Sequence, residues 1–127
     1  MTAGTPFAIL NANAAIAYDA MKAGSRGFNG VSTNLHPDLY QWLYTKGSEY
    51  PEIAEEVANF LVLAALSEAF GYPVLAKIYH QRIGTFNSIT SRSITFDVRE
   101  RFWALDAIID HLLAGTEAVR KRVAGLR

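Results

Sequence analysis

Cysteine is absent from this sequence of 127 residues. Its absence excludes disulfide bonds, thiolate metal sites and a cysteine nucleophile. A chain without disulfides suits a reducing compartment, so we expect a cytoplasmic protein.

An excess of charge of either sign is also lacking, because 12 lysines and arginines balance 12 aspartates and glutamates. A neutral chain has no general attraction to nucleic acid or to an anionic membrane surface. The longest apolar run, Phe60 to Leu66, is far shorter than the roughly 20 residues that span a bilayer. The segment Met1 to Pro6 has neither a basic cluster nor a long apolar stretch, so we expect no signal peptide. Neither nucleic acid nor a membrane is an expected partner.

The first third of the sequence predicts alternating strands and helices. Phe7 to Leu10 is a short apolar run, which is typical of a strand buried on both faces. Residues 14–23 predict a helix that Asn11 or Asn13 can cap. Residues 26–33 predict a second strand.

A second helix is expected to begin at Pro37, since proline suits the first helical position, and to run to about Thr45. The order strand, helix, strand, helix is a βαβ unit, which implies parallel strands. Two such strands alone leave two unpaired edges, so they are expected to need neighbours that this chain does not contain.

The remainder of the sequence is predicted to be helical, so the chain is mostly α by content. Helices are expected over Pro51 to Phe70 and over Val74 to Ile83, and a polar loop over residues 85–94. Thr95 is expected to cap a long helix that ends at Gly115, and Thr116 a short last helix. We therefore predict two parts, residues 1–48 and residues 49–127.

Several short motifs together resemble the dihydrodipicolinate synthase / N-acetylneuraminate lyase family of class I pyruvate aldolases. The run that begins at Phe7 is followed by an Ala-Gly-x-x-Gly step at residues 23–27 and by Asn34 and Pro37, in the order and spacing of that family's last two β/α units. Tyr72-Pro73-Val74 followed by Lys77 is similar to a step in the family's C-terminal helical domain.

The resemblance implies an α/β fold: a partial (β/α)8 TIM barrel, made of its last two β/α units, followed by a C-terminal helical domain. Family members form a Schiff base between a lysine on strand six and pyruvate or a related 2-keto acid, and a tyrosine on strand five relays protons. Both strands would lie upstream of Met1, so no catalytic residue is expected here. The resemblance also implies a homo-oligomer, and it implies the missing barrel portion or a 2-keto acid as partners. No cofactor is expected.

One motif departs from the family pattern. Many members have Gly-Asp-Asp after strand seven, where this chain has Ala12-Asn13-Ala14. The departure argues against dihydrodipicolinate synthase itself.

Candidate substrate-binding residues lie where the two predicted strands end, because a (β/α)8 barrel carries its chemistry at the carboxyl ends of its strands. They are Asn29, Gly30, Ser32, Asn11 and Ala12. The alternative is that the asparagines only cap helices and satisfy turns.

Lys77 is the lysine to test as a Schiff-base former, although a structural salt bridge is the favoured interpretation. The three histidines His36, His80 and His111 have no metal-ligand spacing, so no metal site is expected, and His36 is interpreted as a cap or a surface residue. Two functions stay open: an inactive part of a Schiff-base lyase or hydro-lyase, and a non-catalytic helical interaction module.

Overall fold

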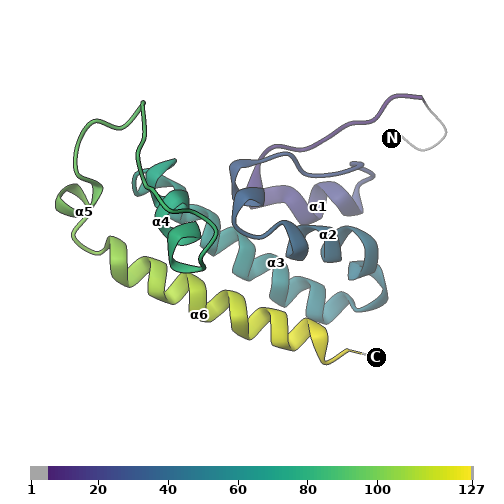
Figure 1. Ribbon diagram of the computed structural model, residues 1–127. Coiled ribbons are helices and arrows are strands. Elements are labelled where there is room, and N and C mark those ends of the chain that lie inside the picture. The colour runs from purple at the N-terminus through teal and green to yellow at the C-terminus, as the bar shows by residue number, and fades with distance from the viewer. Residues whose placement is uncertain (1–5, 127) are drawn as a thin grey trace. The chain divides into compact units, whose positions relative to one another are not determined.

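Helices dominate the computed structural model, which describes residues 6–126 (Figure 1). The chain is 64% helix, and the described residues form no β-strand, sheet or barrel. The predicted α/β class, with a partial TIM barrel, is therefore wrong. A single parallel bridge joins Asn11, the residue after the first predicted strand, to Phe28 of the second. Parallel pairing becomes a sheet only with further strands and with cover on both faces, and a lone pair has neither.

The chain divides into two compact units, Met1–Ala65 and Leu66–Arg127. The predicted boundary after residue 48 stays a prediction. No single helix of the described chain is long and apolar enough to cross a membrane. Among the described residues, one bent pair of helical segments, Pro51–Ala69 with Val74–Arg82, meets the criteria of length and composition when the two are taken together.

The first unit is built on three α-helices: α1 (Ala17–Lys22), α2 (Pro37–Lys46) and α3 (Pro51–Ala65). Short 3-10 helices lead into or extend them: η1 (Ala14–Ile16), η2 (Val31–Asn34) and η3 (Gly47–Glu49). Pro37 is at the start of α2 as predicted, and the Asn13 side chain accepts a hydrogen bond from the Ala15 amide at the start of η1. Residues 31–33 of the second predicted strand belong instead to the 3-10 helix η2.

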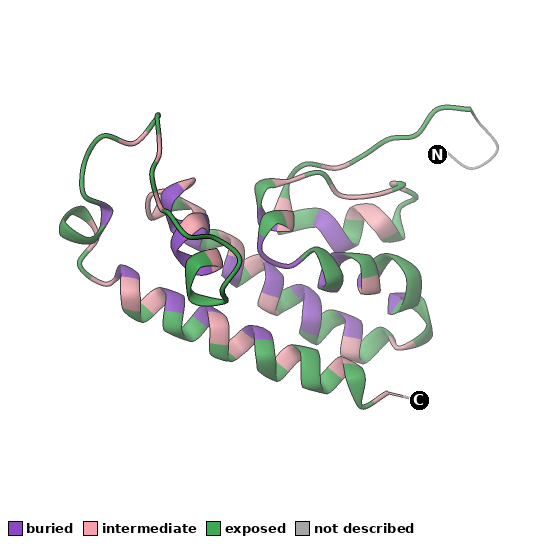
Figure 2. Cartoon of the chain, viewed as in Figure 1, coloured by how far each residue is buried: buried purple, intermediate pink, exposed green. Residues whose placement is uncertain are grey.

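Helix α3 supplies much of the core of the first unit. Its residues Ala54, Val57, Ala58, Leu61 and Ala64 are buried and recur every three or four positions (Figure 2). This spacing places them on one face of the helix. The predicted apolar stripe of this helix is confirmed for Val57, Leu61 and Ala64, whereas Ile53 and Phe60 are only partly buried.

His36, at the N-cap position of α2, corrects one prediction. Its side chain makes no capping hydrogen bond and is 1% exposed, so it is not a surface residue. The imidazole packs edge-on against Phe60, with 5.5 Å between ring centroids. Such an aromatic contact favours a buried imidazole over an exposed one.

The second unit contains η4 (Leu66–Ala69), α4 (Val74–Arg82), α5 (Val98–Arg101) and α6 (Leu105–Ala124). The polar loop predicted over residues 85–94 is confirmed. The single helix predicted from Thr95 to Gly115 is wrong, because the chain leaves the helical conformation at Phe102, whose φ is −120° and ψ 81°. There the Phe102 ring packs edge-on against Phe70.

The ends of these last helices also differ from the prediction. Asp97, rather than Thr95, caps α5 by accepting hydrogen bonds from the Arg99 and Glu100 amides. Thr116 does not cap a separate helix: it lies buried within α6 and donates a hydrogen bond to the Leu112 carbonyl oxygen. Helix α6 therefore continues through Gly115, which costs only about 1 kcal/mol relative to alanine.

Candidate functional site

Four of the five predicted site residues lie together where the two extended segments end. The Asn29 amide donates to the Asn11 carbonyl oxygen at 2.8 Å, and the Asn11 amide donates to Gly27 at 3.0 Å. The Ala12 carbonyl oxygen lies close to the Cα of Gly30, at 3.1 Å from where a Cβ would be. We call Asn11, Ala12, Asn29 and Gly30 the asparagine rim.

Ser32 is not part of this rim. It lies in η2, is 2% exposed, and its carbonyl oxygen accepts from the Leu35 and His36 amides. A residue so deeply buried does not face a ligand at the surface of the unit.

The side chain of Asn11 is engaged in local structure. Its Nδ2 donates to the Asn13 carbonyl oxygen at 2.7 Å, and its Oδ1 accepts from the Asn13 amide at 3.1 Å. Asn13 in turn caps η1. These bonds favour the capping interpretation for Asn11 and Asn13, whereas the side chain of Asn29 is exposed.

Gly30 is held in a confined position. A Cβ there would lie 2.3 Å from Cζ of Phe28, whose ring packs on Tyr40 with 4.4 Å between centroids. The close approach of the two segments thus requires glycine at this position.

Replacing Gly30 with alanine should lower the free energy of unfolding by about 1–3 kcal/mol, because Phe28 and the Ala12 backbone must both move. Gly27→Ala is the matched control: its Cβ would meet only the end of the Leu10 side chain, at 3.2 Å. Urea unfolding followed by circular dichroism measures both. Equal losses for the two variants would show that confinement at Gly30 is unimportant.

The outer side of the first extended segment is open. Ala8 and Leu10 make no backbone hydrogen bond within the described residues, whereas the Ile9 carbonyl oxygen accepts from the Arg26 amide at 2.8 Å. The side chains of Phe7, Ile9 and Leu10 are 77%, 57% and 55% exposed. We call residues 7–11 the extended edge.

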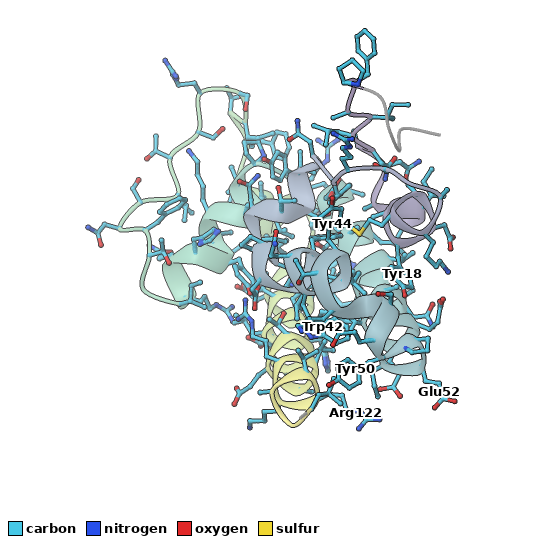
Figure 3. All side chains as sticks on the ribbon, turned by 90° about the vertical axis from the view of Figure 1, so that its right-hand side faces the viewer. Tyr18, Trp42, Tyr44, Tyr50, Glu52 and Arg122 are labelled. Atoms are coloured by element: carbon cyan, nitrogen blue, oxygen red, sulfur yellow. The ribbon has the colours of Figure 1, made fainter. Side chains whose placement is uncertain are left out.

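A groove between α1 and α2 was not predicted from the sequence. It consists of two hollows, of about 210 Å³ and 350 Å³, that share Met21 and Tyr44. Tyr18 of α1 and Tyr44 of α2 both line the larger hollow (Figure 3). The spacing of Tyr40 and Tyr44, four residues apart on one helix, is the signal that could have indicated it. We call it the α1–α2 groove.

Lys22 borders the same groove and is held by two carboxylates. Its Nζ lies 2.9 Å from Glu55 and 2.9 Å from Asp19, and 4.6 Å from the centre of the Tyr18 ring. The hydrogen bonds with Glu55 and then Asp19 raise the pKa of Lys22 above its ordinary value. Lys22 is therefore a protonated lysine, which is the opposite of what a Schiff-base former needs.

In the second unit, Lys77 donates a hydrogen bond from Nζ to the Thr90 carbonyl oxygen. It thus anchors the polar loop, whereas a salt bridge was predicted. Arg82 and Arg99 form ion pairs in this unit: Asp106 lies 2.7 Å from Arg82 Nη2 and 3.0 Å from Arg99 Nε. The hydrogen bonds from Arg99 and from Arg82 hold the pKa of Asp106 below its ordinary value.

Metal ligands do not gather anywhere in residues 6–126, where no three histidine, aspartate or glutamate side chains come together. Comparisons with protein-family models, with curated proteins and with solved structures found no match. Any functional conclusion must therefore rest on the residues of this chain alone.

Proposed function

We propose that this protein is a non-catalytic interaction module that pairs with a second copy of itself through the extended edge. The observation that supports the proposal is the exposure of three large apolar side chains beside the backbone groups of Ala8 and Leu10, which make no hydrogen bond within the described residues. An extended segment of this kind is a template for strand addition.

The backbone pattern defines where a second strand would attach. In a paired strand, alternate residues direct their N–H and C=O groups to opposite sides. Asn11 uses both of its groups toward residues 27 and 29, and Ile9 accepts from Arg26. Ala8 and Leu10 therefore present their groups to the other side, where a new strand can bond.

The chemistry of the extended edge favours a second copy as the occupant. No charged residue occurs before Asp19, so two copies of this segment do not repel each other. A two-fold arrangement sets the apolar side chains of one copy against the same side chains of the other. Pro6 has no N–H and so limits the pairing at one end.

Analytical ultracentrifugation of the full chain tests this proposal. We expect a monomer–dimer equilibrium, and we expect Ile9→Lys to weaken dimerisation by roughly tenfold or more, because it places two lysines near the symmetry axis. Ile16→Lys is the matched control, since Ile16 is also 50% exposed but lies outside the extended edge.

A second variant and the observed oligomeric state test the proposed dimer further. Leu10→Pro removes one outward N–H that makes no bond within the described chain, and it should also weaken the dimer. A protein that stays monomeric at all concentrations, or that forms ever larger oligomers as its concentration rises, contradicts a closed dimer. So does an equal effect of Ile9→Lys and Ile16→Lys.

A second candidate function is favoured by the asparagine rim. Residues that the family resemblance assigned to substrate binding lie together at the carboxyl ends of two segments bridged in parallel. We propose on this ground that the chain supplies one wall of a site for a 2-keto acid, and that the Schiff-base lysine comes from outside it.

This candidate predicts that the chain alone is inert toward pyruvate. Incubation with pyruvate and borohydride should give no covalent adduct in the mass spectrum, because Lys77 is engaged with Thr90 and Lys22 is held in its charged form. An adduct with one pyruvate per chain, mapped to either lysine, would contradict the prediction. Lys77→Arg and Lys22→Arg identify which lysine has reacted.

A further inference from the structure

We propose that the second unit binds the surface of an anionic lipid membrane through residues around the short helix α5. Phe96 precedes α5, Arg101 is its last residue and Trp103 follows it. We call these three residues the α5 patch. The inference is independent of the extended edge, which belongs to the first unit.

The α5 patch is exposed on a segment whose other side chains are packed. Val98 is 3% exposed, and the Phe102 ring packs edge-on against Phe70 with 5.7 Å between ring centroids. By contrast, Trp103 is 92% exposed and Phe96 is 44% exposed, and most of α5 is open to solvent (Figure 2). The two exposed aromatic side chains are therefore presented by a segment that is anchored to the second unit.

The side chain of Trp103 has the chemistry of a membrane-interface anchor. An indole combines a large apolar ring system with one N–H donor, and this combination favours the layer between lipid head groups and acyl chains. The four residues of α5 span about 6 Å, so Phe96 and Trp103 can reach the same lipid surface. Contact with lipid would remove apolar area from water that the described chain leaves exposed.

The balanced total charge, from which no membrane partner was expected, conceals an uneven distribution along the chain. No aspartate or glutamate occurs between Glu68 and Asp97. The Asp97 carboxylate is engaged as the cap of α5, where it accepts hydrogen bonds from two backbone amides. The segment that leads into the α5 patch therefore contributes cations but no anions.

Two arginines supply the attraction to anionic lipid. Arg92, in the polar loop, and Arg101 form no ion pair within the described residues. The Arg101 guanidinium lies 5.2 Å from the centre of the Phe96 ring, so a cation and an aromatic ring are presented together. Glu100 is the one exposed carboxylate within α5, and the two arginines outweigh it. Guanidinium groups match the phosphate and carboxylate oxygens of anionic head groups.

The same features favour a membrane over nucleic acid. Binding to a nucleic acid strand needs a row of basic side chains that follows the phosphate backbone. Two unpaired arginines beside a fully exposed indole are too few for such a row, whereas they suffice for a peripheral contact with lipid.

Co-sedimentation of the full chain with lipid vesicles tests the proposal. One set of vesicles contains phosphatidylserine and phosphatidylcholine in equal parts, and the other contains phosphatidylcholine alone. We expect saturable binding to the mixed vesicles that weakens as salt is added, and binding to the neutral vesicles that is roughly tenfold weaker or more.

Tryptophan fluorescence shows whether the α5 patch makes the contact. Trp42→Phe leaves Trp103 as the only tryptophan. On addition of mixed vesicles its emission should move to shorter wavelength and should be quenched by lipids with brominated acyl chains. This measurement leaves the α5 patch unchanged, so it tests the proposal even if a variant of the patch does not fold.

Variants with matched controls separate the apolar contribution from that of charge. Trp103→Ala should weaken binding about tenfold, and Arg101→Gln about fivefold. Leu66→Ala is the apolar control, because Leu66 is 64% exposed in the same unit but lies outside the patch. Lys121→Gln is the charge control, because Lys121 is exposed and already paired with Glu117. Neither control should weaken binding by more than about twofold.

Several results would overturn the proposal. They are the absence of saturable binding to mixed vesicles, equal binding to both kinds of vesicle, and emission from Trp103 that does not change on binding. Equal losses from Trp103→Ala and Leu66→Ala would do the same. Tighter binding to a single-stranded oligonucleotide than to the mixed vesicles would assign the patch to nucleic acid instead.

Discussion

Replacing Ile109 with alanine should lower the free energy of unfolding by about 2–5 kcal/mol, which is the cost of truncating a fully buried isoleucine. Ile109 lies on α6 and is 0% exposed. Helices α6 and α4 contact each other within the second unit, to which Ile109 belongs. Urea denaturation followed by circular dichroism measures the change in midpoint, provided that the slope of the transition is unchanged.

The neighbouring residue gives a matched control for that substitution. Ile108 is the same residue type, one position earlier on α6, and is only partly buried. Ile108→Ala keeps the same change in helix propensity and the same loss of atoms, but removes fewer buried contacts. We therefore expect it to cost clearly less than Ile109→Ala. Equal losses would mean that the two isoleucines are equally packed and would contradict the buried face assigned to α6.

Helix positions could be predicted where local chemistry and apolar spacing agree. Pro37 and Asn13 act at the helix starts where they were expected, and Val57 and Leu61 occupy the buried face of α3. These features depend on residues within a few positions of each other, which is the range that sequence patterns report.

The prediction of one long helix from Thr95 was wrong because a contact between residues far apart in the sequence overrides the local apolar spacing. Phe102 and Leu105 continue the apolar period of Val98, yet the backbone breaks at Phe102, where its ring meets Phe70. These two rings are far apart in sequence, so helical periodicity contains no information about their contact. The same reason applies to His36, whose buried ring contacts Phe60 of another helix.

The predicted strands failed for a different physical reason. Phe7 to Leu10 has the composition of a buried parallel strand, but here its side chains are exposed. A β-strand needs neighbouring strands to pair its backbone N–H and C=O groups, whereas an α-helix forms these hydrogen bonds within itself. Within residues 6–126 the extended segments form only the parallel bridge between Asn11 and Phe28. The exposure of Phe7, Ile9 and Leu10, which contradicts the predicted burial, is also the observation on which the proposed pairing rests.

The two candidate sites also differ in how far the sequence could indicate them. The family resemblance gave five candidate substrate-binding residues, of which Asn11, Ala12, Asn29 and Gly30 lie together and Ser32 does not. The α1–α2 groove could not be identified in this way, because its walls come from two helices and from the segment around Phe28. Only the spacing of Tyr40 and Tyr44 is visible in the sequence.

Gly71→Ala should be among the most costly substitutions in the second unit, at about 2–4 kcal/mol, because two penalties add there. The φ of Gly71 is +86°, a conformation that costs a residue with a side chain about 1–2 kcal/mol. A Cβ would also lie 2.9 Å from Cγ1 and 3.3 Å from Cβ of Val98. Val98 is 3% exposed and belongs to the short helix α5, so it cannot move away without disturbing buried contacts.

Gly84→Ala separates these two penalties. Gly84 has nearly the same φ, +83°, but a Cβ there would meet no atom within 4 Å. It should therefore pay only the conformational cost of about 1–2 kcal/mol, and the difference between the two variants gives the cost of displacing Val98. Urea unfolding of both proteins under one set of conditions supplies that difference. If Gly71→Ala and Gly84→Ala lose equal stability, Val98 moves freely, and α5 is then held to the second unit by its other contacts, such as the ring contact between Phe102 and Phe70.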